Sequence, residues 1–175
     1  TLTTPILTAD STYTLVSVAS NGTPNCSQTV LGSVLVSVIA APAASISGAT
    51  TICSGTTATI TFTGTPNATV TYTVDAGPNR TIILDATGTA TLITPVLTAD
   101  STYDLVSVES SGTPSCILPV TGSVTITVKA IPTATIAGTT TICSGTTTNI
   151  TFTGTPDATV NFTVDTLPSQ VILDA

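Results

Sequence analysis

Residues 51–75 read TICSGTTATITFTGTPNATVTYTVD, and this stretch decides the fold. Apolar and hydroxylated residues alternate along 57–63 and again along 68–75. Successive side chains of a strand point to opposite faces of its sheet, so this alternation is typical of strands with one buried and one solvated face. The residues between the two runs, GTPN at 64–67, are turn formers. The stretch therefore predicts neighbouring strands of an antiparallel sheet, without a helix.

The same stretch returns 90 residues later in the chain. Residues 141–165 match it at 20 of 25 positions, and residues 91–108 match residues 1–18 at 15 of 18. Self-similarity at this length indicates one folded unit copied in tandem. A catalytic site is needed once, whereas near-identical copies build length. The repeat therefore favours a structural role.

Turn residues divide one full copy into seven short strands, which we expect at 43–47, 57–63, 68–75, 80–86, 89–97, 102–109 and 122–130. Seven short strands in about 90 residues predict an immunoglobulin-like β-sandwich. In the sixth run apolar residues fall on both faces. We expect that strand either to be covered on both sides or to carry a bulge.

Pro42 and Pro132 occupy equivalent places just after a last strand, and proline ends ladder pairing. We expect the C-terminal half of one repeat at 1–41, a complete repeat at 42–131 and the N-terminal half of the next at 132–175. Such short proline-containing links predict an elongated, fairly stiff rod. Because the chain has no Met, we expect it to be a mature or internal segment of a longer protein.

The composition excludes several classes of function. Two basic residues stand against nine acidic ones, and nucleic-acid binding needs basic side chains, so we expect no nucleic-acid partner. No apolar run approaches the roughly 18 residues that span a bilayer, so we expect no membrane insertion. The chain has no histidine, the commonest general base and metal ligand. We therefore expect no enzyme, no catalytic residues and no cofactor.

A calcium site at a junction between repeats is a hypothesis raised by Asp75, Asp85 and Asp100. Ca²⁺ takes six to eight oxygen ligands, and the chain has neither an acidic 12-residue loop nor an Asp-x-Asp cluster to supply them. We therefore expect no metal site.

The four cysteines, Cys26, Cys53, Cys116 and Cys143, keep the 90-residue offset in two pairs. In a charge-poor chain without Cys-x-x-Cys or histidine they favour disulfides over metal binding. Within the complete repeat a Cys53–Cys116 bridge closes a 63-residue loop, worth about 4 kcal/mol by chain entropy. In an immunoglobulin topology, however, these positions approach opposite ends of the sandwich. A bridge across the junction between successive repeats is the alternative, and free thiols are the third.

Tyr13 and Tyr103 follow LTADST in each copy and open the sixth strand. This position fits a tyrosine corner, in which the hydroxyl bonds to the backbone a few residues upstream. Asp10 and Asp100 could equally cap the same turn through a side-chain bond.

The motifs of the repeat follow one another in a fixed order: Pro-x-Ala-x-Ile-x-Gly, TICSGTT, ITFTGTP, TVTYTVD, LTADSTYxLVSV, a lone Cys and GSVTITV. This order resembles the repeats of giant surface adhesins of Bacteroidota. These include gliding-motility adhesins of the SprB type, which are exported by the type IX system. The resemblance covers the whole chain, and its most specific parts are ICSG at 52–55 and 142–145 and the two LTADSTY blocks. It implies an extracellular, cell-surface filament of tandem immunoglobulin-like repeats. Its partners would be neighbouring repeats, together with surface glycans or export and motility machinery through other regions.

Ser11, Ser101 and Thr166 each follow an aspartate, in a pattern similar to the O-glycosylation acceptors of Bacteroidota. Glycans at these positions would help to solubilise a surface with few charges.

We expect a stalk that holds an adhesive tip away from the cell. One alternative is a pilin-like subunit that polymerises by strand exchange, with the half-repeats filled by neighbours. Another is a carbohydrate-binding accessory domain of a secreted enzyme. That last function calls for an exposed aromatic platform, and the chain has no Trp, three Tyr and three Phe.

Overall fold

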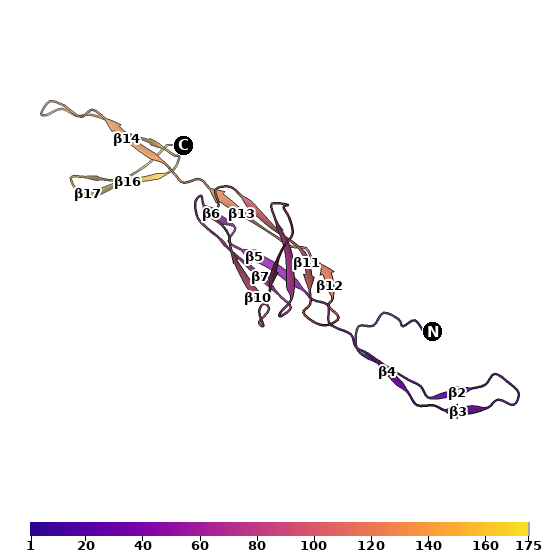
Figure 1. Cartoon of the computed structure of the whole chain (residues 1–175). Helices are drawn as coiled ribbons and strands as arrows, with labels where there is room; N and C mark the ends of the chain where they lie inside the picture. The colour runs from indigo at the N-terminus through magenta and orange to yellow at the C-terminus, as the bar shows by residue number, and fades with distance from the viewer. Residues whose placement is uncertain (175) are drawn as a thin grey trace. The chain divides into compact units, whose positions relative to one another are not determined.

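The structure, a computed structural model, describes residues 1–174 and is built entirely of strands and loops. It has seventeen strands and no helix among these residues (Figure 1). The predicted all-β class is confirmed.

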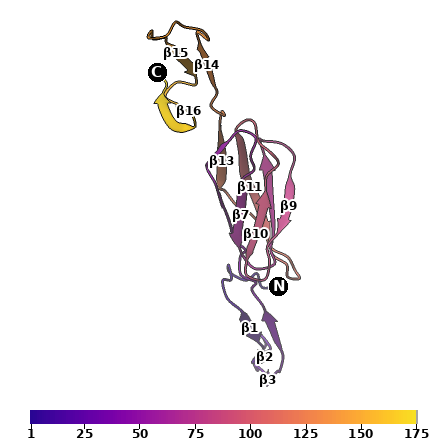
Figure 2. The same cartoon turned by 90° about the vertical axis from the view of Figure 1, so that its left-hand side faces the viewer.

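Residues 44–129 form a sandwich of two sheets (Figures 1 and 2). One sheet has the order β10-β7-β5, made of Thr89–Ile93, Thr59–Gly64 and Ala44–Gly48. The other has the order β6-β13-β11-β8-β9, and β12 pairs with β11. Its strands are β6 (Thr51–Cys53), β13 (Ser123–Lys129), β11 (Ser101–Glu109), β8 (Thr69–Val74), β9 (Arg80–Ile83) and β12 (Ile117–Pro119). The first strand of the repeat is thus divided between the sheets: β5 joins one sheet, and β6 pairs in parallel with the last strand, β13. This is the strand order of an immunoglobulin-like sandwich.

The alternation of the opening stretch becomes the core. Ile60 and Phe62 of β7 are fully buried, and the ring of Phe62 lies 5.1 Å from that of Tyr72 in β8, measured between centroids. Because β7 and β8 belong to different sheets, this pair joins the two layers. The other buried apolar side chains of the sandwich are Ala58, Ala68, Val70, Leu84, Tyr103, Leu105, Val108, Val124 and Ile126.

Strand β11 carries a bulge, one of the two outcomes that its sequence allowed. Its register against β8 shifts between Leu105 and Ser107. An extra residue in one strand changes which side chains point inward. As a result Leu105 and Val108, three residues apart, both reach the core, while Val106 stays exposed.

Two short strands were not predicted. Strand β6 lies in TICSG and is held by its partner: Cys53 is opposite Lys129 of β13. Strand β12 follows the loop after β11, and its Leu118 is opposite Val108. Each is three residues long, too short to show an alternation of its own.

The flanking segments repeat the local structure of the sandwich. Residues 1–41 contain two antiparallel pairs: β1 with β4 (Ser11–Thr14, Ser33–Val36) and β2 with β3 (Ser17–Ala19, Ser27–Thr29). Residues 132–174 contain two more: β14 with β15 (Ala134–Gly138, Ile150–Gly154) and β16 with β17 (Thr159–Val164, Leu167–Ile172).

The flanking segments do not bury the apolar residues that the complete copy buries. Leu15 is 60% exposed and Ile150 is 50% exposed, whereas their equivalents, Leu105 and Ile60, are 7% and 0% exposed. Each segment holds the strands of only half a sandwich, so its core face has no opposing half in the same segment. Burial therefore needs both halves of the repeat.

By their contacts the described residues form two compact units. The first comprises 1–47, 61–92 and 102–124, and the second comprises 48–60, 93–101 and the residues from 125 onward. The strand-free links 37–43 and 130–133 contain the two prolines on which the predicted boundaries rest. The division into 1–41, 42–131 and 132–175 stays a prediction.

Phe62→Ala should lower the free energy of unfolding by about 3–5 kcal/mol, because it removes the ring that packs against Tyr72 between the two sheets and leaves a cavity. Ile83→Ala is the control, since that side chain is 68% exposed and should cost under about 1 kcal/mol. Urea unfolding followed by circular dichroism measures both. Equal losses for the two variants would contradict the proposed role of Phe62 in the core.

Candidate functional site

Cys53 lies at the end of the sheet where the chain leaves the sandwich. Its partner in the parallel ladder, Lys129, is the last residue of β13. The N–H of Ser54 donates to the carbonyl of Lys129 at 2.8 Å, and the hydroxyl of Thr56 donates to the carbonyl of Cys53 at 2.7 Å. The TICSG turn is thus held against the last strand, and the exposed Cys53 lies next to the start of the link to the following repeat.

Cys116 lies in the hairpin 110–116, which joins β11 to β12 (Figure 1). Its N–H donates to Oγ of Ser110 at 2.9 Å, and its carbonyl accepts from the N–H of Ser110 at 3.0 Å. Cys26 and Ser20 make the same two bonds in the first segment, at 3.1 and 2.9 Å. Sequence reasoning missed this serine, although a signal was present: in both copies it stands six residues before the cysteine.

Strand β11 separates the two cysteines. At its start, Oδ1 of Asp100 accepts from the N–H of Val128, next to the strand end that pairs with Cys53. Cys116 follows the other end. A nine-residue strand is about 30 Å long, whereas a disulfide needs Cα atoms within about 7 Å. This separation argues against a Cys53–Cys116 bridge within one repeat. The pairing of the cysteines stays a prediction, and all four are free thiols in the structure.

Tyr103 is buried as the third residue of β11, and Tyr13 is half-buried at the equivalent place in β1. The tyrosine corner itself stays a prediction for both. The carboxylates of Asp10 and Asp100 reach across to the last strand region of their repeats, where each accepts a backbone N–H at 2.7 Å, from Val38 and Val128 respectively. These two bonds tie the start of one strand to the end of another.

The three O-glycosylation candidates lie in different surroundings. Ser101 is 4% exposed, so the folded repeat leaves little room for a glycan there. Ser11, its equivalent, is half-buried in the incomplete first segment. Thr166 is exposed in a two-residue hairpin turn with Asp165, where both residues have positive φ. All three sites stay predictions, and Thr166 is the most accessible of them.

The carboxylates of the calcium hypothesis are engaged by backbone groups. Oδ1 of Asp75 accepts the N–H of Thr102 at 2.7 Å. Oδ1 of Asp85 accepts the N–H groups of Thr87 and Thr89 at 2.8 and 2.9 Å, and the hydroxyl of Thr87 at 2.6 Å. The Thr87 hydroxyl is the main cause that lowers the pKa of Asp85. Across residues 1–174 no three Cys, Asp or Glu side chains gather as metal ligands, and no helix there could cross a membrane.

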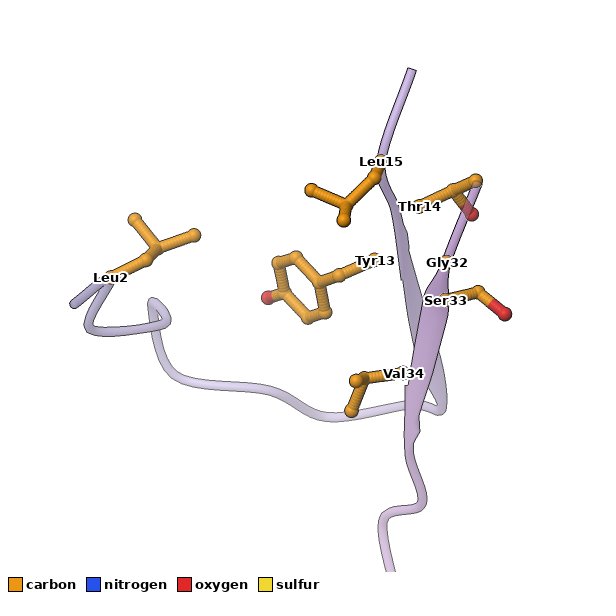
Figure 3. A pocket seen from close by; sticks show the side chains of 7 residues that line it. All are labelled: Leu2, Tyr13, Thr14, Leu15, Gly32, Ser33 and Val34. Carbon is orange, nitrogen blue, oxygen red and sulfur yellow. The ribbon is translucent and has the colours of Figure 1, made fainter. Parts of the chain in front are cut away.

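An apolar hollow of about 560 Å³ lies in the first segment, lined by Leu2, Tyr13, Thr14, Leu15, Gly32, Ser33 and Val34 (Figure 3). In Figure 3 the side chains of Tyr13 in β1, of Leu15 just after β1 and of Val34 in β4 project to one side, toward Leu2. Their equivalents in the complete repeat are all buried: Tyr103, Leu105 and Val124. The hollow is therefore the core-facing side of half a sandwich.

No family model matches the chain, and no curated protein matches it either. Its function is therefore inferred from its sequence and structure. The described residues offer an apolar core, turns fixed by hydrogen bonds, and two cysteines at opposite ends of one sheet.

Replacing Cys53 or Cys116 by Ser should leave the stability of the 175-residue polypeptide nearly unchanged under oxidising conditions. A bridge within the repeat would instead make each variant less stable by about 4 kcal/mol. Urea unfolding with and without a reducing agent measures the difference. A large loss that occurs only under oxidising conditions would restore the Cys53–Cys116 pair.

Asp85→Asn should weaken the loss of stability in acid. The folded-state pKa of Asp85 lies below its ordinary value of 3.8, so the ionised carboxylate stabilises the fold above that pH. This contribution is lost as the pH falls through the lowered value. Between about pH 6 and about pH 3 the urea midpoint should fall more for the parent than for Asp85→Asn. Thr87→Ser keeps the hydroxyl donor and should behave like the parent; identical pH profiles for all three proteins would refute the assignment.

Proposed function

We propose that these residues are a repeat segment of an extracellular filament, the stalk that projects an adhesive tip from a bacterial surface. The observation that carries the proposal is the 90-residue periodicity, which extends from the sequence to the details of the backbone. The same features recur at that offset: positive φ at Asn67 and Asp157, and 2.7 Å bonds at Asp10 and Asp100. Near-identical copies of this kind lengthen a chain and do not add a new catalytic site.

The way the first and last strands pair suits a segment under tension. Strand β6 follows the N-terminal strand of the repeat, and β13 is the C-terminal strand; they run parallel, with Thr51, Ile52 and Cys53 opposite Thr127, Val128 and Lys129. A pull on the two ends of the repeat would slide these strands past each other. The pairs would then be loaded together instead of opening one at a time.

A second candidate function is a pilin-like subunit that polymerises by strand exchange. The open apolar faces of the flanking segments favour it, with Leu15 and Val34 exposed in the first and Ile136 and Ile150 exposed in the last. The first segment carries strands of the second half of the repeat, and the last carries strands of the first half. Two copies could therefore complement each other.

A carbohydrate-binding domain has less support. The aromatic side chains of the complete repeat, Phe62, Tyr72 and Tyr103, are all buried. They form part of the core and offer no platform on which a sugar ring could stack.

The cell-surface location, export by a type IX system and a role in gliding motility rest on the resemblance to Bacteroidota adhesins. Within this proposal the partners are neighbouring repeats. Surface glycans and motility machinery would be contacted through other regions of the same protein.

The mass of the native polypeptide on a reducing denaturing gel separates the two candidate functions. A stalk requires one chain many times heavier than the 17.3 kDa of these residues. A band near 17.3 kDa would contradict the stalk and support the polymerising subunit.

A further inference from the structure

We propose that the TICSG cysteine of one repeat forms a disulfide with the hairpin cysteine of the next repeat. The proposal rests on the proposed function, because it needs repeats joined in tandem. Three observations carry it: a contact across the link, the pairing of Cys53, and two differences in burial between equivalent residues.

The hairpin of the complete repeat contacts the end of the segment before it. A Cβ atom placed on Gly112, within hairpin 110–116, would lie 3.9 Å from Cδ1 of Ile39. Both residues belong to the same compact unit. Gly22 is the equivalent glycine in the first segment, and a Cβ atom there would meet only the carbonyl of Pro24, at 4.0 Å. The contact with Ile39 therefore joins the hairpin of the complete repeat to the end of the segment before it.

Ile39 also marks the position opposite the TICSG cysteine of its own repeat. It stands one period before Lys129, and Lys129 is the ladder partner of Cys53. In the repeat to which residues 1–41 belong, the TICSG cysteine therefore lies opposite Ile39. One residue thus lies next to both cysteine-bearing segments: the TICSG turn of its own repeat and the hairpin of the next.

Two residues near the link and the hairpin are more buried in the complete repeat than in the flanking segments. Pro42 is buried, whereas its equivalent Pro132 is exposed. Cys116 is partly buried, whereas its equivalent Cys26 is exposed. Pro42 and Cys116 belong to the complete repeat, in which both the link from the preceding segment and the hairpin are described. Every internal junction of a tandem chain would have such a link next to such a hairpin.

The chemistry requires an oxidant. Two thiols lose their protons and two electrons as the S–S bond forms, and a small-molecule or protein disulfide accepts them and leaves as two thiols. Exposure of Cys53 leaves its sulfur open to this exchange. The product gives each junction a second covalent connection beside the peptide link, which restricts bending of the stalk. For each of the four cysteines the partner lies in a repeat half outside residues 1–175, so this polypeptide forms no such pair by itself.

The direct test is a polypeptide with residues 43–90 placed before residue 1. This addition completes the first repeat, because residue 90 directly precedes residues 91–108, the near-identical counterpart of residues 1–18. It is equilibrated with oxidised glutathione, alkylated and mapped by mass spectrometry without reduction. We expect one cross-linked pair, between the added copy of Cys53 and Cys116. Cys116→Ser should abolish this pair, and Cys26→Ser should leave it intact. A pair between the added cysteine and Cys26, or free thiols throughout, overturns the proposal.

A second measurement uses the 175-residue chain and tests the contact alone. With the native cysteines replaced by Ser, Ile39→Cys combined with Gly112→Cys should cross-link on oxidation. It should do so on the order of tenfold more than the control, Ile39→Cys with Gly22→Cys. Equal yields overturn the proposal. Neither readout depends on the native mass, so a stalk-sized chain without the bridge would refute the disulfide alone.

Discussion

The packing of Phe62 against Tyr72 is the contact on which the rest of the structure depends, because it joins two sheets that are each apolar on one face only. The last segment shows what happens without the second half of the repeat. Phe152 and Phe162 still meet there, with centroids 4.7 Å apart, yet Ile150 remains half exposed. The aromatic pair forms from neighbouring strands, whereas a dry core needs strands from both halves of the repeat.

The division of the first strand connects this core to the ends of the repeat. Strand β5 closes one sheet, and β6 crosses to the other and runs parallel to β13. This crossing brings Cys53 to the residue from which the chain departs, while the β11–β12 hairpin keeps Cys116 at the opposite end. A repeat built in this way places one cysteine near each of its ends, as the proposed bridge between successive repeats requires.

The polar groups of the sandwich act on the backbone. Asp75, Asp85 and Asp100 each accept backbone N–H groups at turns or strand ends, and the described residues leave no buried side-chain N or O atom without a partner. These hydrogen bonds fix the turns of the backbone, which is compatible with the proposed structural role. The apolar hollow beside Tyr13 is also compatible with it, because the hollow is a core face without its opposing half.

The sequence by itself determined the longer strands, the repeat and the all-β class, because alternation with a period of two and self-similarity are local patterns that need no knowledge of pairing. It also allowed the bulge of β11, visible as apolar residues on both faces. Only the tertiary structure decided which distant strands meet: the pairing of β6 with β13, the ends at which Cys53 and Cys116 lie, and the burial of Ser101. A three-residue strand has no periodicity to detect, and its position is set by a partner more than 70 residues away along the chain. Strand alternation specifies which face is buried, and tertiary pairing specifies which residues share an end.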